Sequence, residues 1–209
     1  QQFLPVAWTP DNRPHALPTL AGDPDGAATA INQQGQIVGI TGKCDNAVGR
    51  FSAIHAVMWD EGRVIDMGNI GGNAWNTPMD MNDRGEAVGF ADLSGDPTGN
   101  NPTFHAFFWA RGQAMVDLGT LPGDAISEAL GINNRGEIVG LSFGAGFSHP
   151  QAVIWIHGQI FNLNSMVSNG STMNLIDAQE INDRGEITGQ GVDTSGNTPA
   201  FLLVPDDDD

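Results

Sequence analysis

The strongest constraint on this chain is an internal repeat, because one nine-residue pattern occurs four times at intervals of about fifty residues. Its consensus is Ile-Asn, two polar residues, Gly-Glu and then Ile-Val-Gly. The four copies are residues 31–39, 81–89, 132–140 and 181–189. A chain that carries the same segment four times is expected to build four copies of one small structural unit.

A second motif recurs with the same period and consists of an apolar run that ends in tryptophan. Its four copies end at Trp8, Trp59, Trp109 and Trp155, and a fifth copy without tryptophan covers residues 200–203. A third motif, of the type Asp-Leu-Gly-Thr-Leu, follows each tryptophan run. Each motif is expected to contribute β-strand, and the tryptophan motif is the kind of short apolar run that predicts a strand covered on both faces.

The segment between the third and fourth predicted strands of each unit has the form Asn-x-x-Gly. Asparagine favours the first position of a type I turn, and glycine favours the last. No segment shows a sustained helical period of apolar residues. Each unit is therefore predicted to hold four short strands joined by tight turns, and the fold class is all-β.

Four-stranded units of this length are typical of β-propeller blades. A single small sheet cannot bury both faces, whereas blades stacked around an axis cover one another and protect their edges. The prediction is a propeller of four blades, with a five-bladed ring or an open array as alternatives. A sandwich or a β-solenoid is the competing architecture. Since the chain starts and ends on the same strand type, we expect residues 200–204 to pair near the first unit and close the ring.

The repeats place the whole chain in one domain, residues 1–205. Its units are approximately residues 1–50, 51–100, 101–146 and 147–205, and an acidic tail follows at 206–209.

Taken together, the motifs resemble a known family. The segments His105–Trp109, Asp117–Gly123 and Ile132–Gly140 look like the extracellular HAF repeat of bacterial proteins. The resemblance covers nearly the whole chain, although the first and fourth units lack the histidine. It implies a secreted bacterial protein made of tandem repeats, and it brings no catalytic residues with it.

The charge of the chain excludes some partners. The formal net charge is −17, from 25 acidic and 8 basic residues, which repels nucleic acid. No apolar stretch is long enough to cross a membrane as a helix. A glycan or a protein is the expected partner, and the chain is expected to be a monomer or to self-assemble through open ends.

Three arginines recur at one place in the repeat and are the first candidate ligand-binding residues. Arg84, Arg135 and Arg184 each precede the turn glycine, so a ring of them would clamp an anion or a sugar. The alternative is a solvated turn with local salt bridges. Gln34 breaks the series in the first unit.

The longest connections carry aspartates that suggest a metal. Asp45, Asp92, Asp96 and Asp193 supply the hard oxygen ligands that calcium prefers, which makes calcium the candidate cofactor. None of these segments matches a twelve-residue calcium loop. The alternative is that aspartate serves there only as a turn former.

Trp75 is the one tryptophan outside the repeat period, and it lies in a polar segment. Such a residue is a candidate for stacking on a sugar ring, and the alternative is a lid over the core.

Three functions are compatible with this sequence. The first is a secreted, non-catalytic module that binds carbohydrate or another cell-surface ligand. The second is a hydrolase or lyase with one site at the propeller mouth, and the third is a structural or assembly protein.

Overall fold

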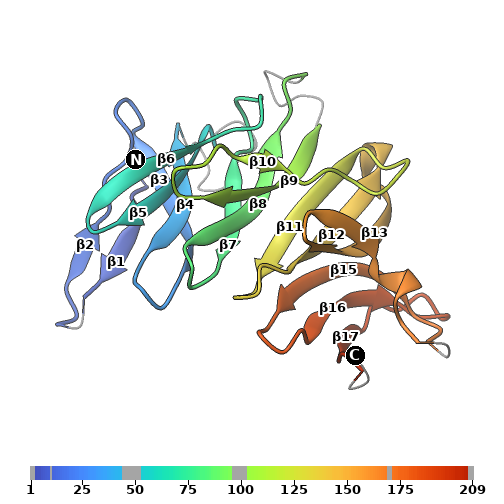
Figure 1. Ribbon diagram of the computed structural model, residues 1–209. Helices are drawn as coiled ribbons and strands as arrows, with labels where there is room; N and C mark the ends of the chain where they lie inside the picture. Colours follow the sequence, from blue (N-terminus) through green and yellow to red (C-terminus); the bar gives the residue numbers. More distant parts are fainter. Residues whose placement is uncertain (1–2, 10, 44–52, 96–102, 169–170, 207–209) are drawn as a thin grey trace.

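The computed structural model describes residues 3–9, 11–43, 53–95, 103–168 and 171–206, and it consists of antiparallel β-sheets (Figure 1). The all-β prediction is confirmed. The only helical elements in the described residues are two short 3-10 turns, η1 (Ala145–Phe147) and η2 (Leu163–Ser165). No helix in this part of the chain is long and apolar enough to pass through a membrane.

Five sheets follow one another along the chain. An N-terminal hairpin is formed by β1 (Val6–Trp8) and β2 (Pro14–Ala16). The first sheet holds β3 (Asp25–Ile31), β4 (Ile37–Gly42), β5 (His55–Asp60) and β6 (Arg63–Gly68). The second sheet holds β7 (Thr77–Met81), β8 (Glu86–Asp92), β9 (Phe104–Ala110) and β10 (Val116–Asp117).

The third sheet is complete and the fourth is shorter. The third holds β11 (Ile126–Ile132), β12 (Ile138–Gly144), β13 (Ser148–Ile156) and β14 (Gln159–Asn162). The fourth holds β15 (Asn174–Ile181), β16 (Ile187–Val192) and β17 (Ala200–Leu203). Each sheet is a simple antiparallel meander in chain order.

The sheets are out of phase with the sequence units. A unit begins near the tryptophan motif, whereas each of the four larger sheets begins with the strand that leads into the Asn-x-x-Gly turn. The hairpin therefore corresponds to the third and fourth strands of a sheet. The Asp-Leu-Gly-Thr-Leu segment also contributes less strand than predicted, because the chain turns at Gly119 with a φ of 68° and β10 has already ended.

A feature shared by the four sheets is a bulge in the first strand, opposite a glycine in the second. In the third sheet the register shifts between Ala129 and Gly131. The same shift occurs in β3, β7 and β15. A Cβ at Gly140 would run into the backbone carbonyl oxygen of Glu128, and the equivalent glycines, Gly39, Gly89 and Gly189, meet β3, β7 and β15 in the same way. The glycine of each Ile-Val-Gly motif is thus required by close approach of two strands.

The core consists of three apolar layers, each between two neighbouring sheets. Trp109 and Met115 of the second sheet pack with Val38 and Met58 of the first. The third sheet contributes Trp155 to the next layer in the same way. The last layer joins the third sheet to the fourth and has Leu203 at the tryptophan position.

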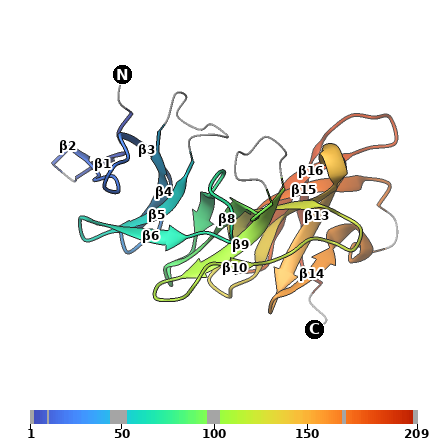
Figure 2. The same cartoon turned by 90° about the horizontal axis from the view of Figure 1, so that it is seen from above.

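The sheets fan out side by side, and the hairpin and the fourth sheet lie at opposite ends of the fan (Figures 1 and 2). No core cluster among the described residues joins the hairpin or the first sheet to the fourth. The expectation that the last strand closes a ring against the first unit is wrong for this structure, because β17 pairs with β16 of its own sheet.

Candidate functional site

The four Asn-x-x-Gly turns lie together at one end of the first strands and form the candidate site. Each turn is closed by its asparagine. In the third sheet, the Asn133 side-chain oxygen accepts hydrogen bonds from the backbone N–H groups of Arg135 and Glu137, both at 3.0 Å. The Asn133 amide also donates to the Glu137 carboxylate at 2.5 Å. An asparagine that closes its own turn in this way is favoured over other residues.

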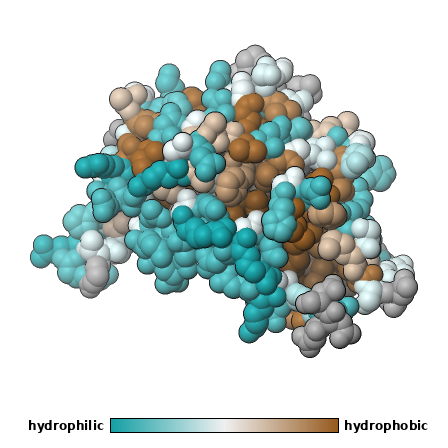
Figure 3. Space-filling model, viewed as in Figure 1, coloured by the Kyte–Doolittle hydropathy of each residue, from teal (hydrophilic) through white to brown (hydrophobic). Residues whose placement is uncertain are grey.

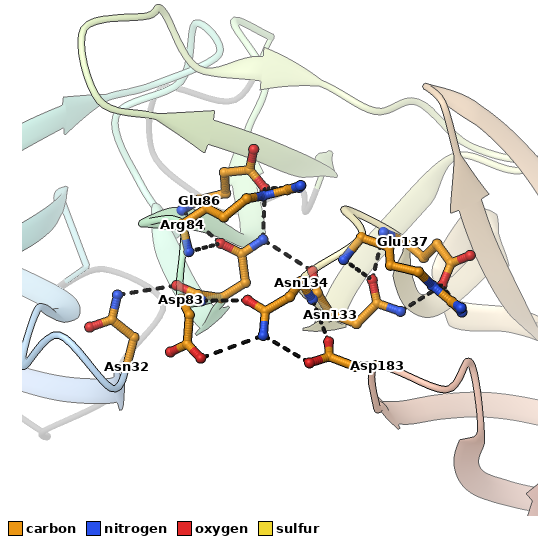
Figure 4. A network of polar contacts seen from close by, with 10 residues as sticks. Asn32, Asp83, Arg84, Glu86, Asn133, Asn134, Glu137 and Asp183 are labelled. Carbon is orange, nitrogen blue, oxygen red and sulfur yellow. Dashed lines mark hydrogen bonds and ion pairs between the residues drawn. The ribbon is translucent and has the colours of Figure 1, made fainter.

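The same asparagines also tie each turn to the next one along the chain (Figure 4). The side-chain amide of Asn32 donates to the backbone carbonyl of Asn82 at 3.1 Å. Asn82 donates to Asn133, and Asn133 to Asn182, at the same distance. We call this series the asparagine ladder. It runs in one direction, with each amide pointing to the following turn.

The residue after each ladder asparagine makes a second set of contacts. The backbone N–H of Gln33 donates to Asp83 at 2.9 Å, and that of Asp83 donates to Asn134 at 2.9 Å. Asn134 in turn donates through its backbone and its side-chain amide to Asp183, at 2.7 and 2.9 Å. Because the Asn134 side chain and backbone donate to it, the pKa of Asp183 lies below its usual range.

These turns enclose an open hollow of about 320 Å³, which we call the turn hollow. It is lined by the three residues that start each turn, 31–33, 81–83, 132–134 and 181–183, together with Asp80. Oxygen acceptors and amides dominate this lining. Figure 3 shows hydrophilic residues along this edge of the molecule. The hollow is therefore suited to a polar ligand that offers several hydroxyl or ammonium donors.

Asp80 and Glu180 add carboxylates near the hollow. An Asp80 oxygen accepts a hydrogen bond from the backbone N–H of Ile132 at 2.9 Å, which ties β7 to β11. Burial nevertheless raises the pKa of Asp80. The pKa of Glu180 is also raised, first by burial and then by the negative charge of Asp80. The sequence analysis did not single out these acids, because they do not recur in every unit: the equivalent positions in the first and third sheets are Ala30 and Gly131.

Glu128 on β11 carries the largest shift, because burial raises its pKa from 4.5 to about 7. The folded state holds this proton more tightly than the unfolded chain does. Glu128 therefore destabilises the fold progressively as the pH rises from about 4.5 through about 7.

We expect Glu128→Gln to raise the free energy of unfolding at alkaline pH by about 2 kcal/mol and to change it little at pH below 4.5. The reason is that the amide has a similar shape and no charge to desolvate. Urea titrations of both proteins across this pH range measure the difference. An equal effect of the substitution at every pH would contradict the assigned cause.

The structure places the three candidate arginines on the turns, and each is paired within its own turn. Arg84, Arg135 and Arg184 contact the carboxylates of Glu86, Glu137 and Glu186 at 2.6, 2.7 and 2.5 Å. The guanidinium of Arg84 also lies against Gly136 of the next turn, and that of Arg135 against Gly185. This geometry matches the local salt bridges considered from the sequence, and anion binding by these arginines stays a prediction.

The candidate metal ligands are spread over different parts of the chain. Asp92 is buried in β8, with 1% of its surface exposed. Asp193 closes a turn by accepting hydrogen bonds from Ser195 and Asn197. Asp45 and Asp96 lie outside the described residues. In the described part of the chain, no three His, Cys, Asp or Glu side chains lie close enough together to hold a metal ion.

Trp75 belongs to an aromatic cluster before β7. Its ring lies 4.8 Å from that of Phe104 and 6.1 Å from that of Phe90. Phe104 is fully buried, so Trp75 covers part of the core, as the lid interpretation expects. Sugar stacking on this ring stays a prediction.

Sequence reasoning missed the residues that line the turn hollow most directly. Asp83, Asn134 and Asp183 vary between the units and resemble ordinary turn formers. Their shared position, immediately after each ladder asparagine, is the signal that could have identified them.

Comparison of the chain with protein-family models and with curated proteins finds no match to either.

Proposed function

We propose that this protein is a secreted, non-catalytic binding module of the HAF-repeat type. In this proposal its sheets are blades of a β-propeller-like array. The support is the succession of four equivalent sheets, each packed on the next through its tryptophan or leucine position. Repeated turns presented by a rigid scaffold offer several similar contacts to one extended ligand.

The turn hollow is the proposed binding site, and a carbohydrate is the proposed ligand. The observation that carries this is the lining by aspartate and amide side chains from four successive turns. Sugars are recognised by such carboxylate and amide groups through their hydroxyls. A cell-surface protein is the alternative partner.

A glycan-array screen of the labelled chain, with calcium and with a chelator, tests this function. For any glycan that binds, Asp183→Asn is expected to weaken binding about tenfold, since a hydrogen bond to a charged acceptor contributes about 1.5 kcal/mol. Asp11→Asn is the matched control, because Asp11 is an exposed aspartate that does not line the turn hollow.

Binding that Asp183→Asn leaves unchanged would place the ligand elsewhere, with Trp75 as the next residue to test. No binding to any glycan in either condition would remove carbohydrate as the ligand.

A hydrolase or lyase is the second candidate. Asp80 and Glu180 lie near the hollow and both have a raised pKa, and acid–base chemistry uses such pairs of carboxyl groups. Product formation from a bound glycan, abolished by Asp80→Asn, would favour it over simple binding.

A further inference from the structure

A groove of about 610 Å³ lies between the third and fourth sheets. Its apolar walls include Ile154 of the third sheet, Leu163 just after that sheet, and Ile187 and Leu203 of the fourth. Apolar side chains reach the surface where these two sheets meet (Figure 3). In each of the two preceding layers, a tryptophan occupies the equivalent space.

The groove exists because the fourth sheet has a smaller residue at the tryptophan position. Leu203 is the equivalent of Trp109 and Trp155, as the strand register shows. It pairs with Ile187, just as Trp155 pairs with Ile138 and Trp109 pairs with Ala87. Trp109 and Trp155 are 2% and 1% exposed. A leucine in the same place fills less volume. Within the described residues, no strand follows β17 to add the apolar contacts that β14 supplies in the third sheet.

The N-terminal hairpin has the opposite property, because its tryptophan belongs to none of the apolar layers in the described part of the chain. Trp8 pairs with Pro14 as Trp59 pairs with Val64, so β1 is an ordinary strand of the tryptophan type. Yet Trp8 is 65% exposed. Among the described residues, β2 is the only strand paired with β1, so the edge that β5 offers to β4 is open in β1.

The two ends of the asparagine ladder are also complementary: in the described residues, the last turn has an arginine that no following turn contacts, and the first turn has a glycine that no arginine covers. At the last turn the Arg184 side chain is 77% exposed. The side chains of Arg84 and Arg135 are 49% and 50% exposed, because each lies against the glycine of the following turn. At the first turn, a Cβ added to Gly35 would meet no atom of the described residues within 4 Å. At Gly136 and Gly185, by contrast, it would meet the arginine of the preceding turn.

Ile31 shows the same incompleteness. It is 66% exposed, whereas its equivalents in the other three sheets, Met81, Ile132 and Ile181, are only 5–6% exposed. Among the described residues, the surface before the first turn therefore lacks the neighbour that every later turn has.

From these observations we infer that a second copy of this chain docks its β1–β2 hairpin on β16, in place of β17, so that Trp8 takes the position of Leu203 against Ile154 and Leu163. The fourth sheet then has the strand order β15, β16, β1 and β2, which is that of the complete sheets. The same placement sets the Asn182 turn beside the Asn32 turn of the second copy. Asn182 then donates to the Asn32 carbonyl, and Arg184 lies on Gly35.

This interface is head-to-tail, so it closes into a ring or continues as a filament according to its rotation. Its strength is limited by two polar residues on β16. Thr188 and Gln190 are polar, whereas the equivalent positions are apolar in the complete sheets. These positions are Val38 and Ile40 in β4, and Val139 and Leu141 in β12. Trp8 and Ile31 are thus the main apolar anchors, and association in the micromolar range is expected.

Sedimentation velocity of the 1–209 chain across the micromolar range tests the inference. The unsubstituted protein is expected to self-associate reversibly. Trp8→Ala is expected to weaken association roughly thirtyfold, as for loss of a central aromatic anchor. Because Trp8 is exposed in the single chain, this variant is expected to keep its fold.

Leu203→Trp is the second variant and leaves β1 untouched. It restores the tryptophan of the complete sheets in β17, fills the groove from within, and is expected to block association while keeping or raising the melting temperature. Val116→Asp is the control, because Val116 is 47% exposed and lies away from both ends.

A monomer at every concentration would overturn the inference, as would association that survives both Trp8→Ala and Leu203→Trp. A monomer in which Trp8 fluorescence is nevertheless that of a buried ring would mean that the hairpin of the same chain occupies the groove, which also overturns the second-copy assignment.

Discussion

Trp155→Ala is expected to lower the free energy of unfolding by about 3–5 kcal/mol, the range for removing a large buried aromatic side chain. The indole is 1% exposed, and its N–H donates to the backbone carbonyl of Leu118 in the preceding sheet at 3.0 Å. The substitution removes apolar contacts between the second and third sheets and leaves that carbonyl without its donor. Urea unfolding followed by circular dichroism measures the loss.

Trp8→Ala is the matched control for this prediction, since it removes the same side chain from the same motif where it is 65% exposed. At high dilution, where the chain is a monomer, it is expected to change the stability by less than about 0.5 kcal/mol. Equal losses in the two variants would contradict the view that tryptophans stabilise the array only between sheets.

Asn133→Ala is expected to cost about 3 kcal/mol. Asn133 is 3% exposed and makes four hydrogen bonds, two from backbone donors in its own turn, one to Glu137 and one to the carbonyl of Asn182. An alanine removes all four hydrogen bonds from groups that are partly buried, at about 1–3 kcal/mol for the least solvated of them. Thermal unfolding should show the melting temperature lowered by roughly 6–12 °C for a chain of this size.

Asn182→Ala isolates the part of this effect that comes from the ladder. Asn182 makes the same contacts within its turn, through Arg184, Glu186 and the Glu186 carboxylate, but it is exposed and no following turn lies beyond it in the described residues. Its loss is expected to be about 1 kcal/mol. If both variants lose the same amount, the contact between successive turns contributes nothing to stability.

The sequence was sufficient to predict most of the strands, because they follow from short-range patterns. The Asn-x-x-Gly turns and the apolar runs ending at Trp59, Trp109 and Trp155 are visible in any one unit, and all of them lie where expected. The turn position of Arg135 and its salt bridge to Glu137 also follow from local spacing.

Contacts between units were beyond such reasoning. The hydrogen bond from Asn82 to Asn133 joins residues about fifty positions apart. The spacing does not show whether the amide bonds only within its own turn or also to the next turn. The burial of Glu128 depends on which neighbours the sheets supply. The choice between a closed ring and the open array could not be made from the sequence, because closure depends on the angle between sheets, which side-chain packing sets and no motif encodes.

The one-way asparagine ladder has a consequence for how such chains change in length. Every turn carries an asparagine amide that can donate and an asparagine carbonyl that can accept, so the ladder hydrogen bond can form between any two turns. Recombination between two copies of the repeat within a gene would add or delete a whole unit while leaving each remaining junction already matched. Array length can therefore change in evolution without substitutions at the ladder asparagines.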